Sequence, residues 1–233
     1  MSQHSAASEP SSTQVGGGSA ASANPETSDD AGAKTIAKAV FDGSFKTIER
    51  YVDILTGRGV EWGLIGPREP ARIWGRHILN CASLSGLLPH GSTVMDIGSG
   101  AGLPGIPLAV LRPDLEMVLV ESLQRRATFL DLAVDELGLA DRVTVVRGRA
   151  EDQSMAVDVV TCRAVAPLEK LLKWTANHFL PDGALVALKG ASANDDLAAA
   201  GRELARRRLT GTVVTVRADQ RAEPTQAIVV RKI

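Results

Sequence analysis

The chain has 233 residues, of which 44% are hydrophobic and 23% are charged, and its formal net charge is −1. This length suffices for one globular α/β domain with a real core and excludes two large domains. The two cysteines, Cys81 and Cys162, exclude a disulfide framework and lack metal-site spacing, so we expect no metal and a reducing, cytoplasmic compartment. No apolar run is long enough to span a membrane, and the N-terminus lacks the features of a signal peptide.

Residues 1–32 are rich in Ser, Ala, Gly and Thr and contain four acidic residues but no Lys or Arg. Such a segment cannot bury enough apolar surface to offset the entropy lost on ordering, so we predict a disordered low-complexity tail. Because the tail contributes −4, the remainder of the chain carries a net charge of +3. This mildly basic charge permits a nucleic-acid partner without requiring one.

Residues 33–90 are predicted to form an N-terminal helical lobe. Apolar residues recur at three- and four-residue spacing between Ile36 and Leu55, and a second helix begins near Arg72 after a glycine-rich loop. Arg72 and Arg76 are one helical turn apart and share a face, which makes Arg76 a candidate RNA contact on a discontinuous basic rim. Scattered charges of this kind are usually solvated surface, which is the competing interpretation.

Residues 91–233 alternate between apolar runs and helix-forming segments, which predicts a Rossmann-like, doubly wound and mostly parallel seven-stranded sheet. The expected strands are 93–97, 116–121, 142–147, 156–161, 184–189, 211–217 and 226–232. The expected helices lie near 105–111, 123–137, 167–179 and 194–208. The last two strands have no helix between them and are expected to pair as an antiparallel hairpin at one edge.

The loop after the first of these strands is the most informative segment of the chain. An apolar run ends in Asp96 near the end of the strand, and four glycines follow: Gly98, Gly100, Gly102 and Gly105. Glycines permit a tight turn and let a ligand press against bare backbone. About 20 residues later the second strand ends in Glu121, where an acid would accept hydrogen bonds from the two hydroxyls of a ribose. The pattern predicts a nucleoside-cofactor site, with an ordinary helix-starting acid as the alternative for Glu121.

The same glycines fit a dinucleotide fingerprint, and Asp96 distinguishes the two kinds of cofactor. A dinucleotide brings an anionic pyrophosphate to this loop, which a carboxylate repels. S-adenosylmethionine brings an ammonium and a sulfonium group, which a carboxylate attracts. The loop therefore favours S-adenosylmethionine over NAD(P), and we expect a class I methyltransferase domain.

Two further segments follow strand ends and are expected to converge on the same site. After the third strand, the backbone at Ala150 and Glu151 would border the adenine, although a solvated loop is an equally good interpretation. After the fourth strand, residues 161–167 have neither the Asn-Pro-Pro-Tyr-like run that grips an exocyclic amine nor the Pro-Cys pair that attacks a pyrimidine. Arg163 stands there instead, and its planar fork of donors suits positioning of a nucleobase, a phosphate or the donor carboxylate. A surface salt bridge is the alternative.

Five sequence blocks resemble the glucose-inhibited division protein B family, in the same order and spacing: 76–79, 96–108, 147–151, 162–164 and 187–190. Members of that family methylate guanine N7 in bacterial 16S ribosomal RNA, and the resemblance covers nearly everything after residue 33. It implies donor contacts at Gly98, Leu103, Ala150, Glu151 and Arg163. It also makes Arg149 a second candidate RNA contact.

The resemblance implies that the chain transfers a methyl group from S-adenosylmethionine to guanine N7, with 16S RNA or the small ribosomal subunit as partner and the chain as a monomer. The chain departs from the family pattern at residues 62–65, at Asn80-Cys81, where Asp-Ser is usual, and around residues 224–226, where an arginine common in the family has no counterpart. These departures weaken what the resemblance implies about RNA contacts and leave the donor site intact. A small-molecule methyltransferase with the same donor site is the alternative, because the overall basic charge is weak.

Overall fold

The computed structural model describes the chain from residue 25 to its C-terminus. Residues 1–24 lie outside the described residues, so the prediction of a disordered tail is untested there. For residues 25–32 the prediction is wrong, because helix α1 (Pro25–Phe41) includes them. The carboxylate of Asp30 accepts a hydrogen bond from the backbone N–H of Gly75 at 3.0 Å. Tertiary contacts of this kind order a segment whose composition alone predicts disorder.

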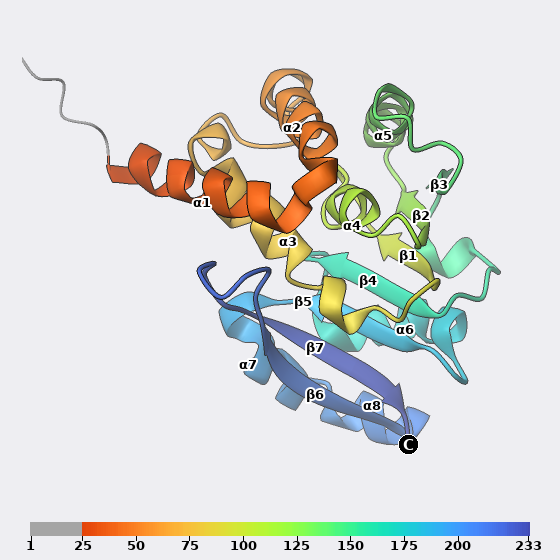
Figure 1. Cartoon of the computed structure of the whole chain (residues 1–233). Coiled ribbons are helices and arrows are strands. Elements are labelled where there is room, and N and C mark those ends of the chain that lie inside the picture. The colour runs from red at the N-terminus through yellow and green to blue at the C-terminus, as the bar shows by residue number, and fades with distance from the viewer. Residues whose placement is uncertain (1–24) are drawn as a thin grey trace, which may run out of the picture.

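Seven strands form one sheet in the order β3-β2-β1-β4-β5-β7-β6 (Figure 1). β1 to β5 pair in parallel, and β7 is antiparallel to both β5 and β6. The fold class and the antiparallel pairing of the last two strands are confirmed. The strands are β1 (Thr93–Ile97), β2 (Glu116–Glu121), β3 (Val143–Arg147), β4 (Val159–Arg163), β5 (Ala184–Leu188), β6 (Leu209–Val216) and β7 (Thr225–Lys232).

The boundaries of β4 differ from the expected range 156–161. Its pairing with β1 begins where Val94 faces Val159, and its pairing with β5 continues to Arg163. Residues before Val159 belong to the loop that follows β3. The shift matters for the site because it makes Arg163 the last residue of the strand, so its side chain starts from a rigid element.

The expected helix at 194–208 is two helices, α7 (Ala193–Ala199) and α8 (Gly201–Arg207). They meet at Ala200, which is fully buried, and Gly201 is a weak helix former. The break lets both helices contact β6.

Helices cover both faces of the sheet (Figure 1). α4 and α5 lie with the N-terminal helices on one face, and α6, α7 and α8 lie on the other. Successive strand residues point to opposite faces, so Val94 packs in the first core and Met95 in the second. Asp96 consequently points to the face that carries α4. The remaining bounds are α4 (Gly105–Leu111), α5 (Gln124–Glu136) and α6 (Leu168–Phe179).

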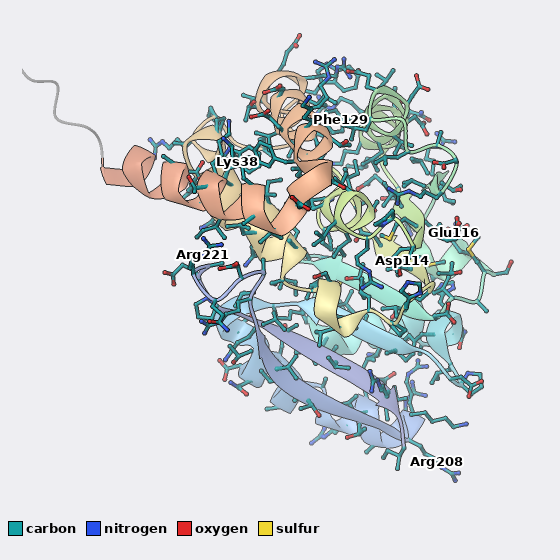
Figure 2. All side chains as sticks on the ribbon, in the orientation of Figure 1. Lys38, Asp114, Glu116, Phe129, Arg208 and Arg221 are labelled. Carbon is teal, nitrogen blue, oxygen red and sulfur yellow. The ribbon has the colours of Figure 1, made fainter. Side chains whose placement is uncertain are left out.

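The N-terminal helices share one core with the α4 face of the sheet. In α2 (Phe45–Ile54) the apolar residues at helical spacing are buried, as predicted. Phe129 of α5, labelled in Figure 2, is fully buried. Its ring packs edge-on against that of Trp62, with ring centroids 6.2 Å apart. The hydroxyl of Tyr51 donates a hydrogen bond to the carbonyl of Ala101 at 2.7 Å, which ties α2 to the glycine loop.

Short helical turns complete the described chain, and two of them, η3 (Glu69–Arg72) and η4 (Trp74–Leu79), lead from the N-terminal helices to the sheet. Among the described residues, no helix combines the length and the apolar content needed to cross a membrane. The others are η1 (Asp42–Ser44), η2 (Leu55–Gly59), α3 (Asn80–Ala82), η5 (Ser85–Leu87), η6 (Ala150–Asp152) and η7 (Gly190–Ser192).

Candidate functional site

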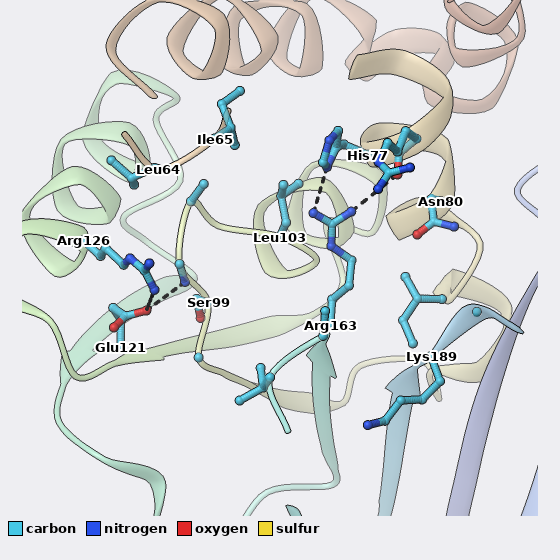
Figure 3. Close-up of a pocket in the computed structure, with 18 of the residues that line it drawn as sticks. Leu64, Ile65, His77, Asn80, Ser99, Leu103, Glu121, Arg126, Arg163 and Lys189 are labelled. Carbon is cyan, nitrogen blue, oxygen red and sulfur yellow. Dashed lines mark hydrogen bonds and ion pairs between the residues drawn. The ribbon is translucent and has the colours of Figure 1, made fainter. Parts of the chain in front are cut away.

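A cavity of about 830 Å³ lies at the carboxyl ends of β1, β2, β4 and β5 and is roofed by the N-terminal helices (Figure 3). The glycine loop forms its floor, with Gly98, Gly100 and Leu103 among the lining residues. Glu121 lies at the β2 side and Arg163 at the β4 side. Four predicted donor-site residues and the candidate positioning residue Arg163 therefore converge on one cavity.

Ala150 and Glu151 do not line this cavity. They line a smaller hollow of about 300 Å³, together with the candidate RNA contact Arg149. The two hollows share Gly98 and Ser122 as lining residues, so they are neighbours along the sheet edge. The predicted convergence is thus a row of two adjacent spaces, which suits an elongated ligand.

Glu121 is held in place by the backbone of the loops around it. Its Oε2 accepts a hydrogen bond from the N–H of Gly100 at 3.0 Å, and its Oε1 accepts one from the N–H of Leu123 at 2.8 Å. Gly100 has a φ of +59°, a conformation that favours glycine and that aims this N–H at the carboxylate. Each oxygen retains lone-pair capacity for a further donor. Glu121 is therefore an oriented acceptor at the cavity wall.

Asp96 requires a correction. Its side chain is fully buried and lines neither hollow, so the predicted direct contact with a ligand is not what the structure has. Its Oδ2 accepts a hydrogen bond from the N–H of Gly105 at 3.1 Å, and its Oδ1 has no partner among the described residues. Asp96 thus anchors the first residue of α4, and its charge acts on the cavity only through space.

Arg163 points into the cavity from the end of β4. One terminal nitrogen donates to Nδ1 of His77 at 2.8 Å, and the other donates to the carbonyl of Arg76 at 3.4 Å (Figure 3). No carboxylate of the described residues forms an ion pair with Arg163, so the surface salt bridge is not its role. The side chain of Arg76 pairs with Glu69 at 3.3 Å and is 59% exposed.

A family model described as rRNA small subunit methyltransferase G, GidB, matches residues 44–224, which is more than half of the chain. The chain belongs to the GidB family. The resemblance found in the sequence is therefore confirmed, and the matched range includes every residue of the two hollows except Thr225.

Curated relatives of this GidB chain carry the name "Ribosomal RNA small subunit methyltransferase G". One from Kineococcus radiotolerans is 57% identical over 156 residues, which are 66% of this chain and 61% of that protein. One from a Nocardioides species is 52% identical over 185 residues, which are 77% of this chain and 73% of that protein. The aligned part thus spans from about three fifths to three quarters of these relatives.

Solved structures support the fold of this GidB chain. The O-methyltransferase NcsB1 from neocarzinostatin biosynthesis, crystallised with S-adenosylmethionine and a naphthoic acid, aligns with a TM-score of 0.52 at 16% identity, covering 64% of this chain and 52% of that one. The tRNA methyltransferase TrmK of B. subtilis aligns with a TM-score of 0.51 at 15% identity, covering 68% and 66%. At such identities the likeness concerns the fold alone.

The polar lining residues that the sequence did not single out for the site of this GidB chain include His77, Asn80 and Lys189. His77 contacts Arg163 directly. Lys189 lies in a block that resembles the family, and its ammonium group pairs with Asp196 at 2.8 Å. The resemblance of that block to the family was the only feature of the sequence that could have pointed to Lys189. No spacing pattern in the sequence predicts that His77 contacts the end of β4.

Replacing Asp96 by asparagine is expected to change how the stability of this GidB chain depends on pH. Burial raises the pKa of Asp96 from 3.8 to about 7. The folded state therefore holds this proton more tightly, and the resulting stabilisation is complete below pH 3.8 and is lost as the pH rises through 7. Wild type should lose up to about 4 kcal/mol relative to Asp96→Asn between pH 4 and 8. Urea unfolding of both proteins across this range measures the difference, and parallel curves would contradict it.

Proposed function

We propose that this chain is a methyltransferase that transfers a methyl group from S-adenosylmethionine to N7 of a guanine in 16S ribosomal RNA. The match to the GidB family over residues 44–224 carries the proposal. The names of the relatives support ribosomal RNA of the small subunit as the substrate. The partner is 16S RNA or the small subunit, the chain acts as a monomer in the cytoplasm, and Arg76 and Arg149 contact the RNA.

The residues of the two hollows fit this donor in the order of the strands. Glu121, at the end of β2, binds the ribose hydroxyls, and Ala150 and Glu151, after β3, border the adenine. Gly98, Gly100 and Leu103 form the floor beneath the methionine part, over β1. Because β4 lies beyond β1 in the sheet, Arg163 then stands at the end of the donor that carries the methyl group.

The lining of the β4 side suits a reaction that needs no general base. Guanine N7 has a free lone pair and no proton, and the bound donor supplies a methyl group on a positively charged sulfur. Among the described residues that line the larger cavity the only carboxylate is Glu121, which lies on the β2 side. Catalysis then rests on holding the reacting atoms in line at about 3 Å and on excluding water. Arg163 provides hydrogen-bond donors in a fixed position for that alignment.

Methyl transfer to defined RNA tests the proposal. The purified chain is incubated with methyl-labelled S-adenosylmethionine and with either small subunits or free 16S RNA from cells that lack the enzyme. We expect label at one guanine as 7-methylguanosine in at least one of the two substrates. Label in neither substrate contradicts the proposed function.

A small-molecule methyltransferase is the second candidate, and the weak basic charge favours it. The positive side chains at the roof are partly neutralised, because Arg72 and Arg76 both pair with Glu69. Binding to RNA weakens steeply as salt is raised, whereas binding of a small neutral acceptor does not. Titrating 16S RNA at 50 and 200 mM salt separates the two: salt-independent or absent binding supports the second candidate.

Glu121→Gln is expected to weaken donor binding by about tenfold to a hundredfold. The amide loses the charge and one acceptor, and a buried, charge-assisted hydrogen bond contributes about 1.5–3 kcal/mol. Calorimetric titration with S-adenosylhomocysteine measures the affinity. Glu116→Gln is the matched control, because Glu116 is exposed at the opposite end of the same strand (Figure 2). Equal affinity of Glu121→Gln and wild type would remove Glu121 from the donor site.

A further inference from the structure

Behind the guanidinium of Arg163 lies a chain of polar side chains from three separate elements. Arg163 at the end of β4 donates to Nδ1 of His77 in η4 at 2.8 Å. Nε2 of His77 lies 2.5 Å from Oε2 of Glu69 in η3. His77 is only 7% exposed, so water competes little for either of its nitrogens. The three residues form one continuous path from the cavity into the N-terminal helices.

The chemistry of the partners defines the proton positions on His77. A guanidinium only donates hydrogen bonds, so Nδ1 of His77 must accept and carries no proton. The single proton of the neutral ring is then on Nε2, where it is donated to Glu69. Burial and the neighbouring Arg163 lower the pKa of His77, so the ring is neutral at neutral pH.

The carboxylate of Glu69 is itself held by two arginines. Its Oε1 pairs with Arg72 at 2.6 Å, and its Oε2 pairs with Nε of Arg76 at 3.3 Å. The charged groups that face the His77 ring are thus Glu69, Arg76 and Arg163. On α1, which packs on η4, Asp30 accepts hydrogen bonds from the backbone N–H groups of Trp74 and Gly75, and the ammonium group of Lys34 lies over the Trp74 ring.

We propose that Glu69 and His77 are positioning residues for methyl transfer: Glu69 holds the His77 ring in the Nε2–H tautomer, and Nδ1 of that ring holds the guanidinium of Arg163 in its working orientation. This inference rests on the proposed function, in which Arg163 aligns the reacting groups. An arginine side chain has several rotatable bonds, and fixing them in advance avoids an entropy cost during the reaction. Because Arg163 lines the cavity, the N–H groups that it does not donate to His77 and Arg76 are available to a ligand there.

Two amide substitutions at His77 separate its two hydrogen bonds. The side-chain oxygen of asparagine can take the place of Nδ1, whereas the amide of glutamine reaches the place of Nε2. His77→Asn keeps the acceptor for Arg163, and His77→Gln keeps the link to Glu69. We expect kcat to fall about tenfold to a hundredfold in His77→Gln, because a misplacement of 1 Å costs up to that factor. In His77→Asn we expect kcat within about threefold of wild type by the same relation.

The pH profile supplies a readout that a purely structural role would not move. When His77 gains a second proton, Nδ1 can no longer accept from Arg163, so kcat should fall on the acid side in wild type. His77→Asn should lack this acid limb. Glu69→Gln removes a negative charge that raises the pKa of His77, so its acid limb should move to lower pH. His90→Asn is the matched control, because the His90 side chain is 90% exposed and lies outside the cavity.

Imidazole ¹⁵N spectra of the full chain test the hydrogen bonds that link Glu69, His77 and Arg163 without any substrate. The chain has four histidines, and loss of one signal in His77→Asn assigns the ring of His77. We expect a neutral ring with the proton on Nε2, and an altered tautomer balance in Glu69→Gln. A proton on Nδ1 at neutral pH overturns the proposal.

The kcat measurements also test the proposal, once melting temperatures close to that of wild type have shown that the variants are folded. Equal kcat in His77→Gln, His77→Asn and wild type overturns the proposal, as does an acid limb that persists in His77→Asn. Failure of the wild type to methylate RNA overturns the proposed function instead. In that case the spectra still report whether Glu69 sets the tautomer of His77.

Discussion

Replacing Arg163 by alanine is expected to lower kcat of methyl transfer about a hundredfold and to leave the fold intact. The side chain reaches the cavity from the end of a rigid strand and is oriented by His77, so it offers donors in a fixed place. Truncation removes the positive charge and all five N–H donors from the end of the cavity where we propose that the methyl group is transferred.

Single-turnover kinetics with labelled donor and small subunits measure this effect. Arg163→Lys keeps the charge and loses the planar fork, so we expect it to recover only part of the rate. Arg202→Ala is the matched control, because Arg202 is exposed on α8 and lines neither hollow. A rate of Arg163→Ala within a factor of two of the Arg202→Ala rate would show that Arg163 has no part in the reaction.

Replacing Gly105 by alanine is expected to destabilise the fold strongly. A Cβ at this position would lie 2.3 Å from Cδ2 of Leu119 and 2.8 Å from Oδ2 of Asp96. Leu119 and Asp96 are both fully buried, so neither can move aside without displacing its own neighbours. Overpacking of this kind costs about 3 kcal/mol, and the hydrogen bond from Gly105 to Asp96 is weakened as well. The melting temperature should fall by roughly 6–12 °C.

Thermal and urea unfolding monitored by circular dichroism measure this loss. Gly201→Ala is the matched control, because Gly201 is likewise the first residue of a helix and has no atom within 4 Å of the new Cβ. That variant should be neutral or more stable by up to about 1 kcal/mol. If both variants had the same stability, the close approach of α4 to the sheet would not be what requires glycine at position 105.

The donor side of the site was predictable because its signals are local. An apolar run that ends in an acid, a loop of closely spaced glycines and a second acid about 20 residues later all lie within one βαβ unit. Gly98, Gly100 and Glu121 therefore line the cavity as predicted. The turn conformation and the hydrogen bond from Gly100 to Glu121 join residues that this short unit already brings together.

Two predictions from the sequence were wrong, and both depend on contacts between segments that are distant in the chain or belong to different elements. Asp96 was expected to face a ligand, but alternation along β1 points its side chain at α4, where the N–H of Gly105 donates a hydrogen bond to Oδ2 of Asp96. Residues 25–32 look unstructured alone, yet helix α1 runs through them and contacts η4 through Asp30. Alternation along a strand orients the Asp96 side chain, but neither the helix that covers that face nor the contact of α1 with η4 follows from composition or spacing.

By itself, the sequence determined the order of strands and helices, the sheet class, the family and the glycine loop with the acid at the end of the next strand, because periodicity and turn chemistry act over a few residues. Only the tertiary structure decided that His77 and Glu69 meet Arg163 and that Ala150 and Glu151 line a separate hollow. Arg163 lies 86 positions beyond His77 in the chain. Contacts over such separations are created by packing of the N-terminal helices on the sheet, which no local pattern encodes.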